Sequence, residues 1–235
     1  MELDYYLDTV NSDGAKRALY VDGKYPFTEA GDIVFDRFFV DEGEPVLNSL
    51  GDETRPKQIA INSWRTAGLN DTSGILPEEF NLYLEKGTHT IRFVTLKTGM
   101  HISGIRVCQP KVARSYEEVK AEYQSLGYKP ANAETINFQA ELTAIEKNDP
   151  TLRRENDGDP FVVPASDINR KLNVMGGYRW RAGNQSITWE FEVPEDGLYK
   201  IGLYVKQQWN DGLPSYRQIA IDGEGPFAEL LEYKV

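Results

Sequence analysis

The stretch RALYVDGKYPFTE at residues 17–29 returns 200 residues later as RQIAIDGEGPFAE at residues 217–229. Six of the thirteen positions carry the same residue, namely Arg, Asp, Gly, Pro, Phe and Glu. In both copies a short segment with apolar residues at alternate positions leads into an Asp-Gly pair, and these two residue types favour a turn. Because chance seldom gives such a match, we interpret it as an internal repeat of one structural unit.

The position of the repeat predicts how the chain is organised. We expect residues 1–108 to be the back part of a first β-sandwich module, 109–135 a helical connector, and 136–235 the front part of a second, related module. On this interpretation the chain is a piece of a longer protein. The alternative is that the two parts complete one sandwich in permuted order.

Apolar and polar residues alternate in both parts, which predicts β-strands that are buried on one face. In the second part, 187–193 is predicted to form a hairpin with 199–205; in the first, 80–84 is predicted to pair with 91–94. Short strands between Gly-, Asp-, Asn- and Pro-rich loops indicate a mainly β, antiparallel sandwich. Its interior is expected to hold Trp189, Phe191, Tyr199, Ile201 and Leu203.

The connector contains the one clear helix signal, at residues 115–126. Ser115 and Glu118 have the spacing of a capping box, and Gly127 is a typical helix terminator. The apolar stripe of this helix is predicted to be Val119, Tyr123 and Leu126.

Composition excludes several classes of protein. With 26 Lys and Arg against 37 Asp and Glu, the formal net charge is −11, and no basic run is present, so nucleic acid and anionic membranes are not expected partners. The sequence has no apolar run of about 18 residues or more, so no membrane span is expected. A lone cysteine, Cys108, excludes an internal disulfide framework, and we expect it to be a small buried apolar side chain.

No catalytic residues are predicted. Glycoside hydrolysis needs two carboxylates across a cleft, and among 37 acidic residues some pair can always be chosen, so composition gives no evidence for it. The sequence contains no nucleophile elbow, phosphate-binding loop or histidine cluster with metal spacing. We therefore expect a protein that is not an enzyme.

Several motifs together resemble a known family. In the order second part then first part, they are residues 138–142, 189–199, 221–223, 82–91 and 102–107. Placed end to end, these segments resemble the jelly-roll carbohydrate-binding modules of the galactose-binding-like superfamily, of the kind appended to solute-binding lipoproteins of bacterial sugar transporters. The resemblance implies an extracellular or cell-surface protein that binds an oligo- or polysaccharide. The fold itself hosts many functions, so the ligand depends on the site.

The resemblance also implies a structural calcium ion, although two positions of the family pattern differ here. Gln139 stands where the family has the first Glu of Glu-x-Glu, and Ser103 precedes Gly104 where an Asp is common. Candidate calcium ligands are Glu141, Asp157 and Asp159. The alternative is that the residues around 149–159 form a solvated acidic loop, in which case no cofactor is expected.

Three tryptophans outside the clean strand patterns are candidate sugar platforms, because an indole face suits the C–H face of a sugar ring. The first is Trp209 with Asn210 and Asp211, on a polar loop that has no tryptophan in the first copy. The other candidates are Trp180, flanked by Tyr178 and Arg181, and Trp64. The alternative for each tryptophan is a plug at the end of the sandwich, and Trp189 is interpreted as structural.

The repeated arginines are expected to form ion pairs at the sandwich rim, Arg17 with Glu29 and Arg217 with Glu229, and the alternative is that they clamp sugar hydroxyls. Incomplete sheets would leave edges that favour self-association. The sequence therefore predicts a carbohydrate-binding module. The alternative is a structural or protein-interaction β-sandwich domain of a transporter-associated lipoprotein, without sugar binding.

Overall fold

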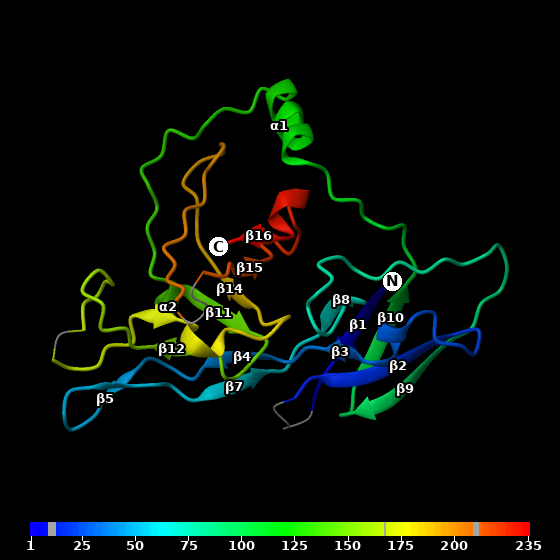
Figure 1. Ribbon diagram of the computed structural model, residues 1–235, viewed down its shortest axis with the longest axis horizontal. Coiled ribbons are helices and arrows are strands. Elements are labelled where there is room, and N and C mark those ends of the chain that lie inside the picture. Colours follow the sequence, from blue (N-terminus) through cyan, green and yellow to red (C-terminus); the bar gives the residue numbers. More distant parts are fainter. Residues whose placement is uncertain (9–12, 167, 209–211) are drawn as a thin grey trace. The chain divides into compact units, whose positions relative to one another are not determined.

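The computed structural model describes residues 1–8, 13–166, 168–208 and 212–235 of the 235-residue chain, and it is mainly β (Figure 1). All pairs of named strands in the described residues are antiparallel, so the predicted antiparallel β class is confirmed. The chain divides into two compact units. The first combines Met1–Cys108 with Phe138–Phe191, and the second combines Gln109–Asn137 with Glu192–Val235. No helix within the described ranges is both long and apolar enough to span a bilayer.

Two three-stranded sheets form the core of the first unit. In one, β1 lies between β8 and β10; in the other, β2 lies between β3 and β9. The bounds are β1 Glu2–Tyr6, β2 Ala15–Val21, β3 Ile33–Phe35, β8 Arg65–Gly68, β9 Ile91–Lys97 and β10 His101–Arg106.

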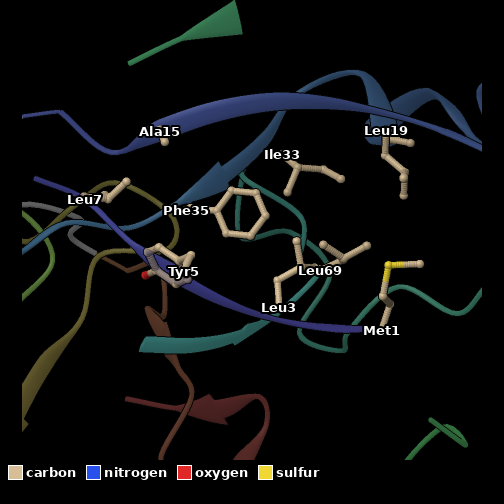
Figure 2. Packing of buried hydrophobic residues seen from close by; sticks show 10 residues of the cluster. Met1, Leu3, Tyr5, Leu7, Ala15, Leu19, Ile33, Phe35 and Leu69 are labelled. Carbon is tan, nitrogen blue, oxygen red and sulfur yellow. The ribbon is translucent and has the colours of Figure 1, made fainter. Parts of the chain in front are cut away.

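Alternation along β1 determines which side chains enter this core. Leu3 and Tyr5 are buried and Leu7 follows them on the same face, whereas Glu2, Asp4 and Tyr6 lie on the other face. Figure 2 shows the side chains of Leu3 and Tyr5 beside those of Phe35 and Ile33. The hydroxyl of Tyr5 donates to the carbonyl oxygen of Asp36 at 2.8 Å, so burial of this tyrosine leaves no polar atom unsatisfied.

A four-stranded sheet in the order β14–β11–β4–β7 draws strands from both parts of the sequence (Figure 1). β4 (Phe38–Asp41) and β7 (Gln58–Ile61) come from the first part, and β11 (Ala144–Lys147) and β14 (Ile187–Trp189) from the second. In this sheet Lys147 pairs with Phe39. Pairing of the two parts within one chain is what the permuted alternative expects; the module boundaries and the sandwich or jelly-roll architecture stay predictions.

Shorter elements complete the first unit. They are the two-stranded sheets of β5 (Val46–Leu47) with β6 (Glu53–Thr54) and of β12 (Arg154–Glu155) with β13 (Val174–Met175), the helix α2 (Ala140–Thr143), and the 3-10 turns η1 (Thr28–Gly31) and η2 (Gly177–Arg179). Helix α2 lies within residues 138–142, the segment that opens the second part of the sequence. Ala, Glu and Leu are good helix formers, and Gln139 accepts the backbone bonds that close this short turn.

The junction of the two parts contains a buried cluster of charges. The ammonium of Lys147, 1% exposed, lies 2.5 Å from the Asp41 carboxylate, and the Arg154 guanidinium lies 3.0 Å from its other oxygen. Burial by itself would raise the pKa of Asp41, but hydrogen bonds from Lys147 and Gln58 and the two positive charges outweigh it, so the pKa falls below its usual value. Arg154 also contacts Glu44 at 2.8 Å. Each charged group of this cluster therefore has an opposite partner.

The predicted hairpin of 187–193 with 199–205 is wrong. Only Ile187–Trp189 forms a strand, and within 190–208 the described pairing is a single bridge between Leu198 and Pro130. Trp189 is half-buried, but the other expected interior residues are exposed, namely Phe191, Tyr199, Ile201 and Leu203. Residues 80–84 are likewise not a strand, although Phe80 and Leu82 pack against the core. Alternation of apolar and polar residues specifies which face is buried. A β-strand also requires backbone hydrogen bonds to a neighbouring strand.

The connector helix is confirmed. α1 spans Tyr116–Ser125, and Ser115 and Glu118 form the predicted capping box. Val119 is buried and Gly127 adopts a left-handed φ of 72° after the helix. The prediction that Cys108 is buried is wrong. Cys108 follows the end of β10 and is exposed.

The sequence repeat is also a structural repeat. β15 (Tyr216–Arg217) pairs with β16 (Tyr233–Lys234) in the register in which β2 pairs with β3, because Arg17 lies opposite Ile33 and Arg217 lies opposite Tyr233. The Asp-Gly turns agree too, with φ values of 50° and 80° in the first copy and 52° and 84° in the second. A 3-10 turn follows each of them, η1 in the first copy and η3 (Ala228–Leu230) in the second.

The predicted pairing of Arg17 with Glu29 is wrong. The Arg17 guanidinium is buried and donates to the carbonyl oxygens of Lys16, Lys97 and Thr98 at 2.8–3.0 Å, and burial lowers its pKa. In the second copy Arg217 makes the same bond to the carbonyl of its predecessor, at 2.9 Å, while Glu229 accepts from the backbone of the connector helix. Carbonyl oxygens are available wherever a strand ends, so they compete with the carboxylate for the guanidinium.

The turn of the first copy is held by a histidine. His89 lies 2.7 Å from the Asp22 carboxylate and 2.7 Å from the carbonyl oxygen of Glu85, and Thr90 donates its N–H to Asp22 at 2.8 Å. The Glu85 carbonyl and the Asp22 carboxylate raise the pKa of His89, and the hydrogen bond with His89 lowers the pKa of Asp22. The charged pair is thus favoured in the folded state.

We predict that His89→Gln removes a pH-dependent part of the stability. A raised folded-state pKa stabilises the fold fully below the unfolded value of about 6.5, and this contribution is lost as the pH rises through the folded value. The lowered pKa of Asp22 makes its contribution present above about pH 4. The difference in unfolding free energy between parent and variant should therefore be larger at pH 5.5 than at pH 8.5 in urea titrations. Asp222→Asn, in the matching turn, is the control, and an equal difference at both pH values would contradict the prediction.

We also predict that Asp41→Asn costs on the order of 3 kcal/mol, because it leaves the buried Lys147 charge without its partner and leaves Arg154 with Glu44 alone. The matched control is Asp32→Asn, which breaks the exposed Lys16–Asp32 pair of 2.9 Å and should cost about 0–1 kcal/mol. Chemical denaturation of both variants checks this. Similar losses would show that the cluster does not hold the sheet together.

Candidate functional site

Trp64 is the most exposed of the described tryptophans and lies on a face built by three strands. Its side chain is 54% exposed and precedes β8, while Tyr6 ends β1 and His101 begins β10. The pairing of β1 with β10 places Tyr6 opposite His101, and that with β8 places Tyr5 opposite Arg65. Because Tyr5 points into the core, Tyr6 points outward. We call Trp64, Tyr6, His101 and Asp8 the Trp64 face.

The rings of this face contact one another without covering the indole. The centroids of Tyr6 and Trp64 are 5.7 Å apart in a tilted arrangement, and those of Tyr6 and His101 are 6.0 Å apart, edge to face. His101 Nε2 lies 2.9 Å from the Asp8 carboxylate, and this hydrogen bond lowers the pKa of Asp8. An ionised carboxylate and a ring nitrogen thus stand at the rim of an aromatic surface.

A small hollow, with room for about one water molecule, is lined by Ser63 and Arg65, the sequence neighbours of Trp64, but not by Trp64 itself, and it lies on the side of β1 that Tyr5 faces. Its polar lining includes Asp36, Arg37, Ser63 and Arg65, and its apolar lining consists of Tyr5, Leu7, Phe38 and Ile61. Burial raises the pKa of Asp36 to about 6, although a hydrogen bond from Asn148 at 3.0 Å acts in the opposite direction. The Asp36 carboxyl group can therefore donate a hydrogen bond in mildly acidic solution and only accept at neutral pH.

Two arginines of the hollow are held in place. Arg65 forms a two-pronged ion pair with Glu146, at 3.1 and 2.6 Å, and its guanidinium stacks 4.2 Å from the Phe38 ring. Arg37 is buried and donates to the side-chain oxygen of Asn62 at 3.2 Å. These contacts make the two arginines part of the rigid framework next to Trp64 in the sequence.

A second predicted group comes together on η2, but its tryptophan is largely used by the fold. Trp180 packs against Trp189 with centroids 6.1 Å apart, and its indole N–H donates to the carbonyl oxygen of Gln185 at 3.3 Å. The Arg181 guanidinium stacks 4.2 Å from the Tyr178 ring and hydrogen-bonds its hydroxyl, so one face of this exposed ring is covered. These contacts favour the alternative that Trp180 is a structural residue that packs within the fold. The third predicted group, Trp209 with Asn210 and Asp211, lies outside the described residues.

The three candidate calcium ligands have structural roles in the fold. Glu141 is buried on α2, and burial raises its pKa. Asp157 accepts the N–H of Asp159, and Asp159 accepts the N–H of Phe161, so both carboxylates cap turns of their loop. In residues 1–8, 13–166, 168–208 and 212–235, no three His, Cys, Asp or Glu side chains lie close enough to hold a metal ion. Calcium binding stays a prediction.

Sequence reasoning found Trp64 but missed its neighbours. The outward parity of Tyr6, next to the buried Tyr5, was a readable signal. Asp8 and His101 carried no comparable signal, because they meet only through the pairing of β1 with β10, whose members lie about a hundred residues apart in the chain. Asp36 and Ser63 likewise join the site through tertiary contacts.

Comparisons of the chain with protein-family models, with curated proteins and with solved structures find no match.

Proposed function

We propose that the chain is a non-catalytic carbohydrate-binding module of an extracellular or cell-surface bacterial protein, with an oligo- or polysaccharide as its ligand. The observation that carries the proposal is the exposed indole of Trp64, with Tyr6, His101 and Asp8 around it. An exposed aromatic ring on a rigid sheet edge, with charged groups at its rim, suits a sugar ring with hydroxyls at its periphery.

The family resemblance of the sequence supports the same function, and it adds a jelly-roll sandwich as the proposed complete architecture. The rigid Arg65–Glu146 pair supports the wall of the hollow and is not itself the sugar ligand.

A structural or protein-interaction domain is the second candidate. It is favoured by the apolar residues Ile201, Leu203 and Val205 of the second unit, each more than half exposed. An exposed apolar surface of this kind is more typical of a contact with another macromolecule than of a sugar-binding site.

We predict that Trp64→Ala weakens binding to the best oligosaccharide from a glycan array by roughly 1–3 kcal/mol, the scale of an aromatic anchor. The melting temperature should change little, because more than half of the indole is exposed. Titration calorimetry measures the affinity. Tyr83→Ala, which removes an 89% exposed ring, is the matched control and should bind normally. Unchanged affinity in the Trp64 variant would exclude the Trp64 face as the sugar-binding site. Trp209→Ala would then test the other candidate platform.

Trp180→Ala is predicted to give the opposite result. Its packing on Trp189 and its hydrogen bond to Gln185 belong to the fold, so the melting temperature should fall while sugar affinity is retained below that temperature. Calorimetric melting and titration on the same sample distinguish the two effects. A stable variant that has lost affinity would place the site on η2 instead.

A further inference from the structure

The outward side of β1 continues beyond the Trp64 face. Asp4 and Tyr6 are two residues apart in this strand, so their side chains leave it on the same side. The buried side chains of Leu3 and Tyr5 leave it on the other side. Two residues of an antiparallel strand span about 7 Å, a distance comparable with the size of one sugar ring. Asp4 therefore lies about one sugar ring along the sheet from the aromatic platform.

Asp4 is the centre of a polar network across the three strands β8, β1 and β10 (Figure 1). Its carboxylate accepts from the Arg106 guanidinium at 2.7 and 2.6 Å and from the Thr66 hydroxyl at 2.6 Å. Arg106 also donates to the Glu2 carboxylate at 3.1 Å. The hydrogen bonds from Arg106 and Thr66 lower the pKa of Asp4 to about 2, so this carboxylate is ionised at neutral pH. We call Asp4, Thr66, Arg106 and Glu2 the Asp4 network.

The Asp4 network has hydrogen-bonding capacity beyond its internal bonds. A carboxylate offers about four acceptor positions, and within the described residues Asp4 uses two on Oδ1 and one on Oδ2. Each terminal nitrogen of a guanidinium carries a pair of N–H groups, and the Nη1 atom of Arg106 gives one of them to Asp4 Oδ2. The side chains of Arg106 and Asp4 are 47% and 27% exposed. The two bonded atoms thus present one acceptor and one donor to solvent.

Gly104 keeps this pair of atoms accessible. It lies opposite Asp4 in the pairing of β1 with β10, and a Cβ atom at this position would be 2.7 Å from Asp4 Oδ2. The φ angle of Gly104 is outside the left-handed region, so the backbone itself does not require a glycine there. A glycine at this position leaves a low polar floor beside the aromatic rings of the Trp64 face.

We propose that the Asp4 network is a second sugar subsite, which binds vicinal hydroxyl groups of the ring next to the one that stacks on Trp64. One hydroxyl donates to Asp4 Oδ2, and its neighbour accepts from Arg106 Nη1. Glu2 and Asp4 carry two negative charges against the single positive charge of Arg106, so the subsite favours a neutral sugar over an acidic one. The inference rests on the proposed sugar binding and deepens it, because it names a neutral segment of at least two rings as the ligand.

The probes are neutral oligomers of glucose, xylose, mannose and galactose, from one unit to four, titrated into the full chain by calorimetry. We expect the affinity for the preferred sugar to rise at least tenfold from one unit to the longer oligomers. Gly104→Val should abolish most of this rise, because its side chain covers Asp4 Oδ2, and should leave the affinity for one unit within twofold. Valine suits a β-strand, so the melting temperature should not fall. Gly87→Val, where a Cβ meets no heavy atom within 4 Å, is the matched control and should keep the full rise.

Two further measurements test the chemistry of the subsite. Asp4→Asn keeps the shape of the side chain but replaces an acceptor oxygen by an amide, so it should remove the same part of the affinity as Gly104→Val. Oligomers of galacturonate should bind at least tenfold more weakly than oligomers of galactose at low salt, and the difference should narrow as the salt concentration rises.

The outcomes separate this inference from the proposed function. A rise in affinity with length that survives both Gly104→Val and Asp4→Asn would overturn the second subsite and leave the Trp64 platform in place. Equal or tighter binding of the acidic oligomers would also overturn it. If no oligomer of any length binds in a way that depends on Trp64, the proposed sugar binding fails, and the second subsite fails with it.

Discussion

The Asp41 carboxylate, bound between Lys147 and Arg154, is the interaction on which the first unit depends. Asp41 ends β4, and Lys147 ends β11, 106 residues further along the chain, so this contact fixes the register of a sheet made from two distant segments. A desolvated carboxylate is acceptable only with such partners, and the lysine is acceptable only with the carboxylate. The pairing therefore specifies one arrangement of the two segments and disfavours slipped ones.

That sheet supports the Trp64 face. β7 of this sheet leads directly into the segment with Ser63 and Trp64, and Arg65, one residue later, is fixed by Glu146 of β11. Asn148, which follows β11, bonds the Asp36 carboxylate of the hollow. The second part of the sequence thus holds in place Asp36 and Arg65, which line the hollow. Rigidity around Trp64 favours the sugar platform that we propose, because a mobile ring loses conformational freedom on binding.

The repeat shows how far local sequence controls structure. Both copies form the same turn, the same register with the following strand and the same arginine–carbonyl bond, all through contacts within about twenty residues. They differ where long-range partners are involved: the first copy has β9 and β10 against it, while Leu203 and its neighbours remain exposed in the second.

The sequence by itself determined the antiparallel β class, the capped helix α1 and the repeat, because alternation, capping and turn chemistry act over a few residues. Only the tertiary structure decided that Arg17 binds carbonyls instead of Glu29, that 199–205 is not a strand, and that Asp8 and His101 join Trp64. It also decided that Trp180 packs on Trp189. Alternation states that a face will be buried, but which distant backbone or side chain buries it depends on pairings that the local pattern does not encode.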